Sequence, residues 1–193
     1  MSIESIVATA SPAARPLRSL PIGQLQALFR DSLAAGDGLA GAHCVHELWM
    51  RGEFGASVEA SLGRLWDLAA DTIPDWLPMR YVEWLPLAYE VAARFQPTGR
   101  GRSNVYLILL DYSDSRSEPF GVYVGMSRYA PSQRFDQHKA GIRAAGSVLK
   151  RGLEPLAGPT LHLQRIRRKD AAQIEEQLAE ALRAEGLFVQ GGH

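Results

Sequence analysis

The stretches Asn104-Val105-Tyr106-Leu107-Ile108-Leu109-Leu110 and Phe120-Gly121-Val122-Tyr123-Val124-Gly125 decide the fold of this sequence. Each is a short, almost continuous apolar run with β-branched and aromatic members, which indicates a buried strand. The residues between them, 111–119, are polar and typical of a turn. The sequence therefore predicts two neighbouring strands joined by a polar connection.

Further elements are expected on the C-terminal side of these strands. A helix that starts after the second strand should turn Phe135 and Ile142 inward, and residues 161–166 read as a short third strand. A long helix is expected over 170–185, with Asp170 as its cap. Together these elements predict an α+β fold, in which a small antiparallel three-stranded sheet is flanked by helices.

The N-terminal part has a different pattern. Residues 1–20 are rich in Ser, Ala and Pro, show no clear period and are expected to form a flexible leader. Apolar residues then recur at helical spacing, so residues 21–97 are expected to form a mostly helical accessory domain. A Gly- and Arg-containing stretch, 98–103, reads as a linker that opens a second domain over 98–193. The apolar stripe of one N-terminal helix comprises Val58, Leu62, Leu65, Trp66 and Ala69.

Composition bounds the class of protein. The chain has 193 residues, 46% of them hydrophobic, which is enough for a buried core. No apolar stretch is long enough to span a bilayer and no signal peptide is evident, so we expect a cytoplasmic protein without a membrane partner. Cys44 is the only cysteine, which excludes an internal disulfide.

The net charge of zero hides an asymmetry between the two halves. Residues 1–97 carry 7 Lys and Arg against 11 Asp and Glu, whereas residues 98–193 carry 14 against 10. The positive excess therefore lies in the half that contains the two strands. A basic surface there is where contacts to phosphate groups would be expected.

Five residue types in the C-terminal half follow a recognisable order. The two strands contain Asn104-Val105-Tyr106 and Tyr123-Val124-Gly125; Arg134 and His138 follow on the next helix, and Glu175 lies on the last one. This set resembles the GIY-YIG nuclease superfamily, over about half of the chain. Asn104 stands where the family has its first glycine, and Met126 where many members have a lysine.

The resemblance implies a metal-dependent endonuclease that hydrolyses phosphodiester bonds in DNA. By this resemblance, Glu175 holds Mg²⁺ or Mn²⁺, Tyr106 accepts the proton of the attacking water, and Tyr123 helps to shape the site. Arg134 supplies positive charge for the phosphate, and His138 tunes the tyrosine or relays its proton. The alternative is a catalytically inactive module of this family that binds nucleic acid or a protein partner.

Helix geometry gives a separate reason to choose between the adjacent acids Glu175 and Glu176. At about 100° per residue, an apolar stripe is expected along one face of the last helix. Glu175 lies at the edge of that stripe, whereas Glu176 points away from it. A metal ligand must reach a site built on the sheet, so the geometry also favours Glu175. The stripe comprises Ile174, Leu178, Ala181 and Leu182.

Two weaker candidates remain. A basic run before the last helix reads either as a solvated strand end or as a contact for phosphates that flank the cut. In the N-terminal half, His43, His46 and Glu47 share a helix face near Cys44, but a zinc site would need further ligands from elsewhere. The basic run comprises Arg165, Arg167, Arg168 and Lys169.

Overall fold

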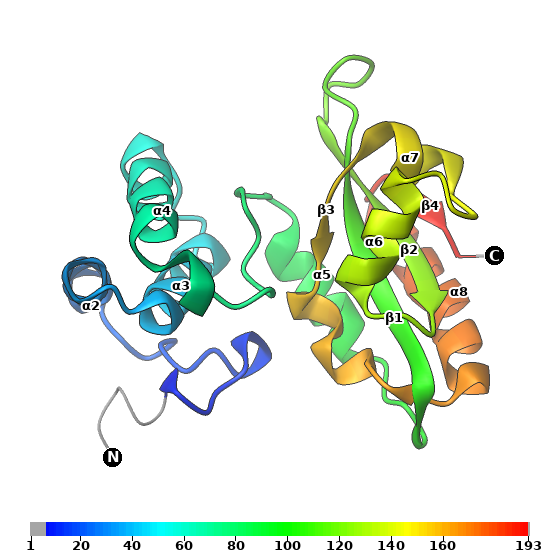
Figure 1. The fold of residues 1–193 in the computed structure, drawn as a ribbon, viewed down its shortest axis with the longest axis horizontal. Helices are drawn as coiled ribbons and strands as arrows, with labels where there is room; N and C mark the ends of the chain where they lie inside the picture. The colour runs from blue at the N-terminus through cyan, green and yellow to red at the C-terminus, as the bar shows by residue number, and fades with distance from the viewer. Residues whose placement is uncertain (1–6, 193) are drawn as a thin grey trace. The chain divides into compact units, whose positions relative to one another are not determined.

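The computed structural model describes residues 7–192, so residues 1–6 of the expected leader and His193 lie outside the described part. The chain forms two compact units, Met1–Leu85 and Pro86–His193 (Figure 1). This division lies N-terminal to the boundary expected at 97/98, because almost all of helix α5 (Leu85–Ala93) belongs to the second unit.

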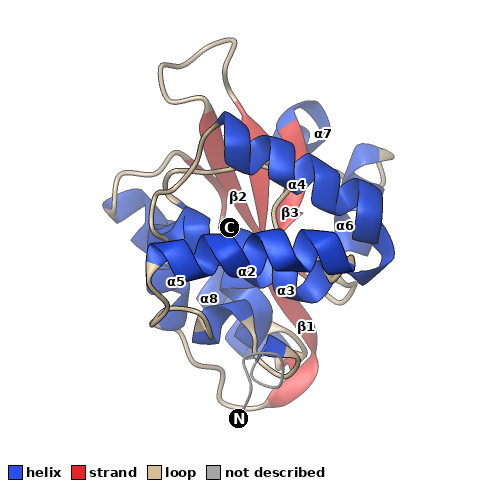
Figure 2. Ribbon diagram, turned by 90° about the vertical axis from the view of Figure 1, so that its left-hand side faces the viewer, coloured by secondary structure: helices blue, strands red, loops and turns tan. Residues whose placement is uncertain are grey.

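The first unit is helical, as predicted. Helices α2 (Ile22–Ala35), α3 (Gly38–Met50) and α4 (Ala56–Ala69) pack on one another (Figure 2). The α2 helix ends at Gly36, which adopts a left-handed conformation with φ 66°. The α3 helix begins at Gly38, where the Asp37 side chain accepts a hydrogen bond from the backbone N–H of Ala40 in the first turn.

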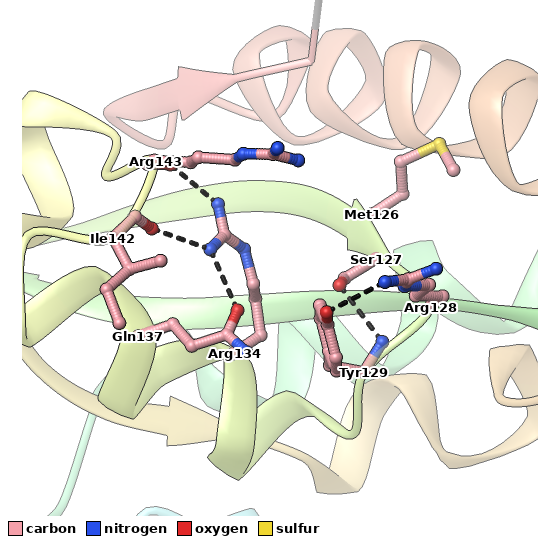
Figure 3. Close-up of a pocket in the computed structure, with 8 residues that line it drawn as sticks. All are labelled: Met126, Ser127, Arg128, Tyr129, Arg134, Gln137, Ile142 and Arg143. Carbon is pink, nitrogen blue, oxygen red and sulfur yellow. Dashed lines mark hydrogen bonds between the residues drawn. The ribbon is translucent and has the colours of Figure 1, made fainter.

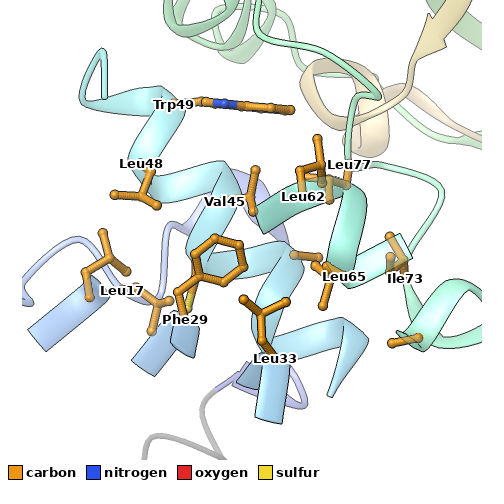
Figure 4. Close-up of a cluster of buried hydrophobic side chains, with 14 of the residues drawn as sticks. Leu17, Phe29, Leu33, Val45, Leu48, Trp49, Leu62, Leu65, Ile73 and Leu77 are labelled. Carbon is orange, nitrogen blue, oxygen red and sulfur yellow. The ribbon is translucent and has the colours of Figure 1, made fainter. Parts of the chain in front are cut away.

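The described part of the expected leader, residues 7–20, is packed rather than free. Leu17 is only 2% exposed and points into the hydrophobic core of the first unit (Figure 4). Arg15 donates two hydrogen bonds to the Glu47 carboxylate, at 3.0 and 2.8 Å. A few widely spaced anchors of this kind leave no periodic pattern, which is why the sequence did not reveal them.

The second unit is built on a four-stranded sheet in the order β3-β1-β2-β4. Strand β1 (Arg100–Asp111) pairs antiparallel with β2 (Phe120–Ser127) and with β3 (Gly152–Leu156), whereas β2 pairs parallel with β4 (Val189–Gly191). The α+β class and the two central strands are therefore confirmed. The expected three-stranded, fully antiparallel sheet is wrong in strand number and in direction.

The third strand was also placed on the wrong residues. Residues Gly158–Leu163 form a 3-10 helix, η3, with Pro159 in its first turn, while the strand that pairs with β1 is β3. Pro155 interrupts the apolar pattern of β3 and is tolerated because β3 is an edge strand. Ile166 bridges to Arg100 and Ser103, so part of the expected linker belongs to β1.

Helices cover both faces of the sheet. Helices α6 (Pro131–Lys139) and α7 (Gly146–Arg151) lie on one side, and α8 (Arg168–Ala184) lies on the other (Figure 1). Tyr106, Ile108 and Leu110 of β1 pack with Val148 of α7. The apolar stripe predicted for α8 is largely buried, with Ile174, Leu178 and Leu182 in the core.

Two local expectations for this unit are wrong. Ile142 lies beyond the end of α6 and is 56% exposed. Asp170 does not cap α8, since the cap position is Arg167. The Asp170 carboxylate instead accepts hydrogen bonds from the backbone N–H and the hydroxyl of Thr98, at 2.9 Å each.

Among residues 7–192, none of the helices has the length and apolar character needed to cross a membrane.

Candidate functional site

The five residues singled out by the resemblance come from four elements: Tyr106, Tyr123 and His138 lie side by side, and the charges of Arg134 and Glu175 are close enough to affect the pKa of both tyrosines. Tyr106 is on β1, Tyr123 on β2, Arg134 and His138 on α6, and Glu175 on α8. The Tyr106 hydroxyl lies 3.2 Å from His138 Nε2. The Tyr123 ring lies 5.8 Å from the His138 ring and 6.3 Å from the Tyr106 ring, measured between centroids.

Gly125 makes this approach possible. It pairs with Tyr106 in the β1–β2 ladder. A Cβ atom at Gly125 would lie 2.7 Å from the Tyr106 hydroxyl and 2.6 Å from the Tyr123 ring. Both contacts are closer than van der Waals packing allows, so any other residue would displace a tyrosine. The last glycine of the second motif therefore has a direct steric role.

The hydrogen bonds of His138 define its tautomer. The backbone N–H of Ala145 donates to Nδ1 at 2.9 Å, so Nδ1 carries a lone pair. Burial lowers the pKa of His138 to about 4, so the ring is neutral near pH 7 and its proton is on Nε2. His138 therefore donates to the Tyr106 oxygen. It can tune the phenol, but in this state it has no free nitrogen to relay the phenol proton.

Arg134 holds a loop as well as a charge. Its Nη1 donates to the Gln137 side-chain oxygen and to the Ile142 carbonyl, both at 3.1 Å, and its Nη2 donates to the Arg143 carbonyl at 2.7 Å. These bonds fix the loop that also presents the Ala145 N–H to His138. The positive charge of Arg134 nevertheless stays close enough to oppose the rise in the Tyr106 pKa.

Burial keeps the two tyrosines protonated in the free protein. Tyr106 is 1% exposed, and desolvation raises the pKa of its phenol well above the usual value. Desolvation also raises the pKa of Tyr123, and the charge of Glu175 adds to this rise. A phenolate at Tyr106 would need additional positive charge beside it.

Glu175 is half-buried, whereas Glu176 is exposed, in line with their expected positions on the helix. Desolvation raises the pKa of Glu175 to about 7, and a hydrogen bond from the backbone N–H of Met126 opposes that rise. Within residues 7–192, Glu175 forms no ion pair. The carboxylate is thus a partly desolvated acceptor without a protein cation.

The surroundings of Glu175 suit a hard cation that keeps most of its water ligands better than a cation bound entirely by protein ligands. Among the described residues, no group of three or more His, Cys, Asp or Glu side chains is placed to hold a metal ion. A single carboxylate fits Mg²⁺, which keeps several waters of its own. It does not fit a structural zinc site, which needs four protein ligands.

The basic run lies next to the first motif. Arg165, Arg167, Arg168 and Lys169 are all exposed. The Asn104 side chain accepts a hydrogen bond from the backbone N–H of Arg165 and donates one to the carbonyl of Tyr129, both at 2.8 Å. Asn104 therefore joins the basic run to the end of β2. Arg100 and Arg165 line a hollow of about 430 Å³ on this side.

Sequence reasoning missed a second hollow, of about 620 Å³, beside Arg134. Its walls include Arg128 and Tyr129 after β2 and Arg143 in the loop after α6 (Figure 3). Tyr129 belongs to no recognisable sequence motif. The only signal for this hollow in the sequence was the positive charge of the C-terminal half of the chain. Nothing in the spacing of these residues indicates that they meet.

The zinc candidate in the first unit is not supported. Glu47 already accepts hydrogen bonds from Arg15 and Arg51, the latter at 2.7 Å. The His43 and His46 rings pack against Trp76, with centroids 4.9 and 5.7 Å away. Burial raises the pKa of the Cys44 thiol to about 12, which disfavours a metal-binding thiolate. These residues belong to the packing of the first unit.

Comparisons of the chain with protein-family models, with curated proteins and with solved structures found no match.

Proposed function

We propose that the second unit is a GIY-YIG-type endonuclease that hydrolyses phosphodiester bonds in DNA with the help of Mg²⁺ or Mn²⁺. The observation that carries the proposal is the contact between Tyr106 and His138, within range of the charges of Arg134 and Glu175. Residues far apart in the sequence converge there in the combination that the resemblance singled out. A cytoplasmic location and a DNA partner are parts of the same proposal.

The chain's own residues divide the work as follows. Tyr106, after its phenol has lost its proton to solvent, takes a proton from the water that attacks phosphorus, while the bond from phosphorus to the leaving oxygen breaks. The His138 N–H and the Arg134 charge stabilise the phenolate that this requires, and the Tyr123 ring lies near both Tyr106 and His138. Glu175 would hold the divalent ion, which supplies positive charge to the phosphate and to the leaving oxygen when it is bound. Arg134 would add to that charge.

A binding module without hydrolysis is the second candidate. Two observations favour it: burial raises the pKa of Tyr106, and the Arg134 guanidinium is already bonded to the loop carbonyls. In such a module the same surfaces would hold nucleic acid or a protein partner, and the phenol would remain protonated.

A nicking assay on supercoiled plasmid separates the two candidates. Wild-type protein should nick the plasmid with Mg²⁺ or Mn²⁺ and should be inactive in excess EDTA. Tyr106→Phe keeps the ring and removes the hydroxyl, so the rate should fall by about 10²- to 10⁴-fold, which is the usual contribution of a general base. Glu175→Ala should be inactive, whereas Glu176→Ala should cut normally.

Each outcome decides between the candidates. Metal-dependent nicking that survives Tyr106→Phe would reject Tyr106 as the base. Binding of DNA without nicking at any pH or with either metal would select the binding module. Activity that survives Glu175→Ala and is lost in Glu176→Ala would show that the metal ligand is Glu176 and not Glu175.

A further inference from the structure

The hollow beside Arg134 carries positive charge and no compensating acid. Three arginines, Arg128, Arg134 and Arg143, are among the residues that line it, and none of the lining residues is Asp or Glu. A basic concavity of this kind attracts anions, and the planar guanidinium group suits a phosphate in particular.

Two of these arginines remain available to a ligand. The Nη1 and Nη2 groups of Arg134 already donate hydrogen bonds to carbonyls of the loop. Within residues 7–192, the Arg143 guanidinium has no hydrogen bond or ion pair. Arg128 donates to the hydroxyl of its neighbour Tyr129, at 3.0 Å, and its guanidinium carbon lies 5.0 Å from that ring. The Tyr129 hydroxyl keeps its own proton for a further acceptor.

The backbone holds Arg143 in a conformation that a residue with a side chain rarely adopts. Its φ is 47°, in the left-handed region, and the hydrogen bond from Arg134 to its carbonyl holds it there. Figure 3 shows the Arg143 side chain extending from its loop across the hollow, with Arg128 and Tyr129 on the far side. Strain of this type is concentrated at ligand-binding positions, where the surrounding structure enforces it.

The opposite wall is equally well fixed. The Tyr129 backbone N–H donates to the Ser127 hydroxyl at 3.1 Å, and the Tyr129 carbonyl accepts from Asn104. The hydrogen bond from Arg128, followed by the charges of Arg128, Arg143 and Arg134, lowers the pKa of Tyr129. Both walls are therefore arranged before any ligand binds, which reduces the entropic cost of binding.

We propose that this hollow binds a second phosphodiester of the nucleic-acid strand, adjacent to the one that is cut. Arg143 and Arg128 are its binding residues, and the Tyr129 hydroxyl donates a hydrogen bond to it. The inference rests on the proposed function for the identity of the strand. Its position follows from Arg134 and Met126, because both line the hollow and both contact residues of the candidate site.

The test measures binding, not cutting, so that it does not depend on catalysis. A fluorescent DNA duplex with 5′-hydroxyl ends, and the same duplex with 5′-phosphates, are each titrated with full-length protein in EDTA, by anisotropy, at a series of salt concentrations. Arg143→Gln and Arg128→Gln are compared with wild type. Arg64→Gln is the matched control, since Arg64 is an exposed arginine of helix α4 in the first unit. Circular dichroism melting checks that each variant is folded.

The expected result is a loss of affinity of about tenfold for each pocket variant at low salt, which corresponds to one lost charged hydrogen bond. The slope of log affinity against log salt should also become shallower by about 0.9, the value for one phosphate contact on duplex DNA. Over a fourfold increase in salt, each variant would then lose about 3- to 4-fold less affinity than wild type. The Arg64→Gln control should match wild type in both measurements.

The outcomes separate this inference from the proposed function. Pocket variants that bind and cut like wild type would overturn the inference and leave the nuclease standing. Pocket-dependent binding by a protein that never cuts would leave the inference standing and reject the nuclease. An effect seen only on duplexes with 5′-phosphates would overturn the internal phosphodiester in favour of a terminal phosphate. A wild-type protein that binds no DNA would overturn both.

Discussion

Replacing Glu175 by Gln removes an ionisable group from a partly desolvated position without changing its shape. The pKa of this carboxyl rises from 4.5 to about 7 in the folded chain. Below pH 4.5 the side chain is protonated in both the folded and the unfolded chain, and it has no effect on the pH dependence of stability. Between pH 4.5 and 7 the unfolded chain ionises first, so the wild type loses stability as the pH rises; above pH 7 the loss is constant.

The size of this loss follows from the pKa. At about 1.4 kcal/mol per pH unit, the full difference is up to about 3 kcal/mol. Solvent reaches part of the Glu175 side chain, so after screening we expect about 2 kcal/mol at pH 8. A neutral Gln avoids this cost. Glu175→Gln should therefore be more stable than wild type by about 2 kcal/mol at pH 8 and by less than about 1 kcal/mol at pH 5.

Urea unfolding in EDTA at pH 5 and pH 8 measures this difference. Glu176→Gln is the control, because Glu176 is the exposed neighbour on the same helix. The reasoning is refuted if Glu175→Gln shows no gain between pH 5 and pH 8, or if Glu176→Gln shows the same gain. Addition of Mg²⁺ at pH 8 extends the test. At 100 times its dissociation constant, a bound ion stabilises the fold by about 2.7 kcal/mol, and this gain should be absent in Glu175→Gln.

Three further predictions concern the second unit. The cleavage rate should rise with pH up to at least pH 9, because burial raises the pKa of Tyr106 and its phenolate becomes more abundant as pH increases; a rate that is flat above pH 7 would contradict this. Arg143→Gly should be as stable as wild type or up to about 1 kcal/mol more stable, since glycine tolerates a positive φ, yet it should bind DNA more weakly; a clear loss of stability in urea unfolding would argue against stored strain. A fragment of residues 86–193 should be folded, as measured by circular dichroism, and should cut DNA. A fragment of residues 98–193 should be less stable, because it lacks helix α5 and because His162 loses its hydrogen bond to the Ala92 or Phe95 carbonyl.

Local patterns in the sequence were sufficient for the elements whose signal is periodic. The continuous apolar runs predicted β1 and β2, and helical spacing predicted a mostly helical N-terminal part, the apolar stripe of α4 and the buried stripe of α8. The half-buried position of Glu175 and the exposed position of Glu176 followed from the same helical spacing. These features depend on residues close in the chain, and each buries its own apolar face whatever partner it meets.

Other features depended on partners far away in the chain. The three residues of β4 are too few to show a period, and they form a strand because they pair with β2. Residues 161–166 alternate like a strand, but the first three of them lie in the 3-10 helix η3, and β3 occupies the edge of the sheet beside β1. Leu17 is held by its packing in the core of the first unit, and Arg15 is held by its hydrogen bonds to Glu47.

The chemistry of the candidate site divides in the same way. The order of Tyr106, His138 and Glu175 could be read from the sequence, but their ionisation could not. The tautomer of His138 is set by the Ala145 N–H, and the raised pKa of Glu175 is set by burial, so both depend on atoms brought in by folding. The pocket at Arg143 requires a left-handed backbone that no local rule assigns to arginine. Sequence alone determined which residues were present; only tertiary structure decided their solvation and their neighbours, because both are properties of the packed chain.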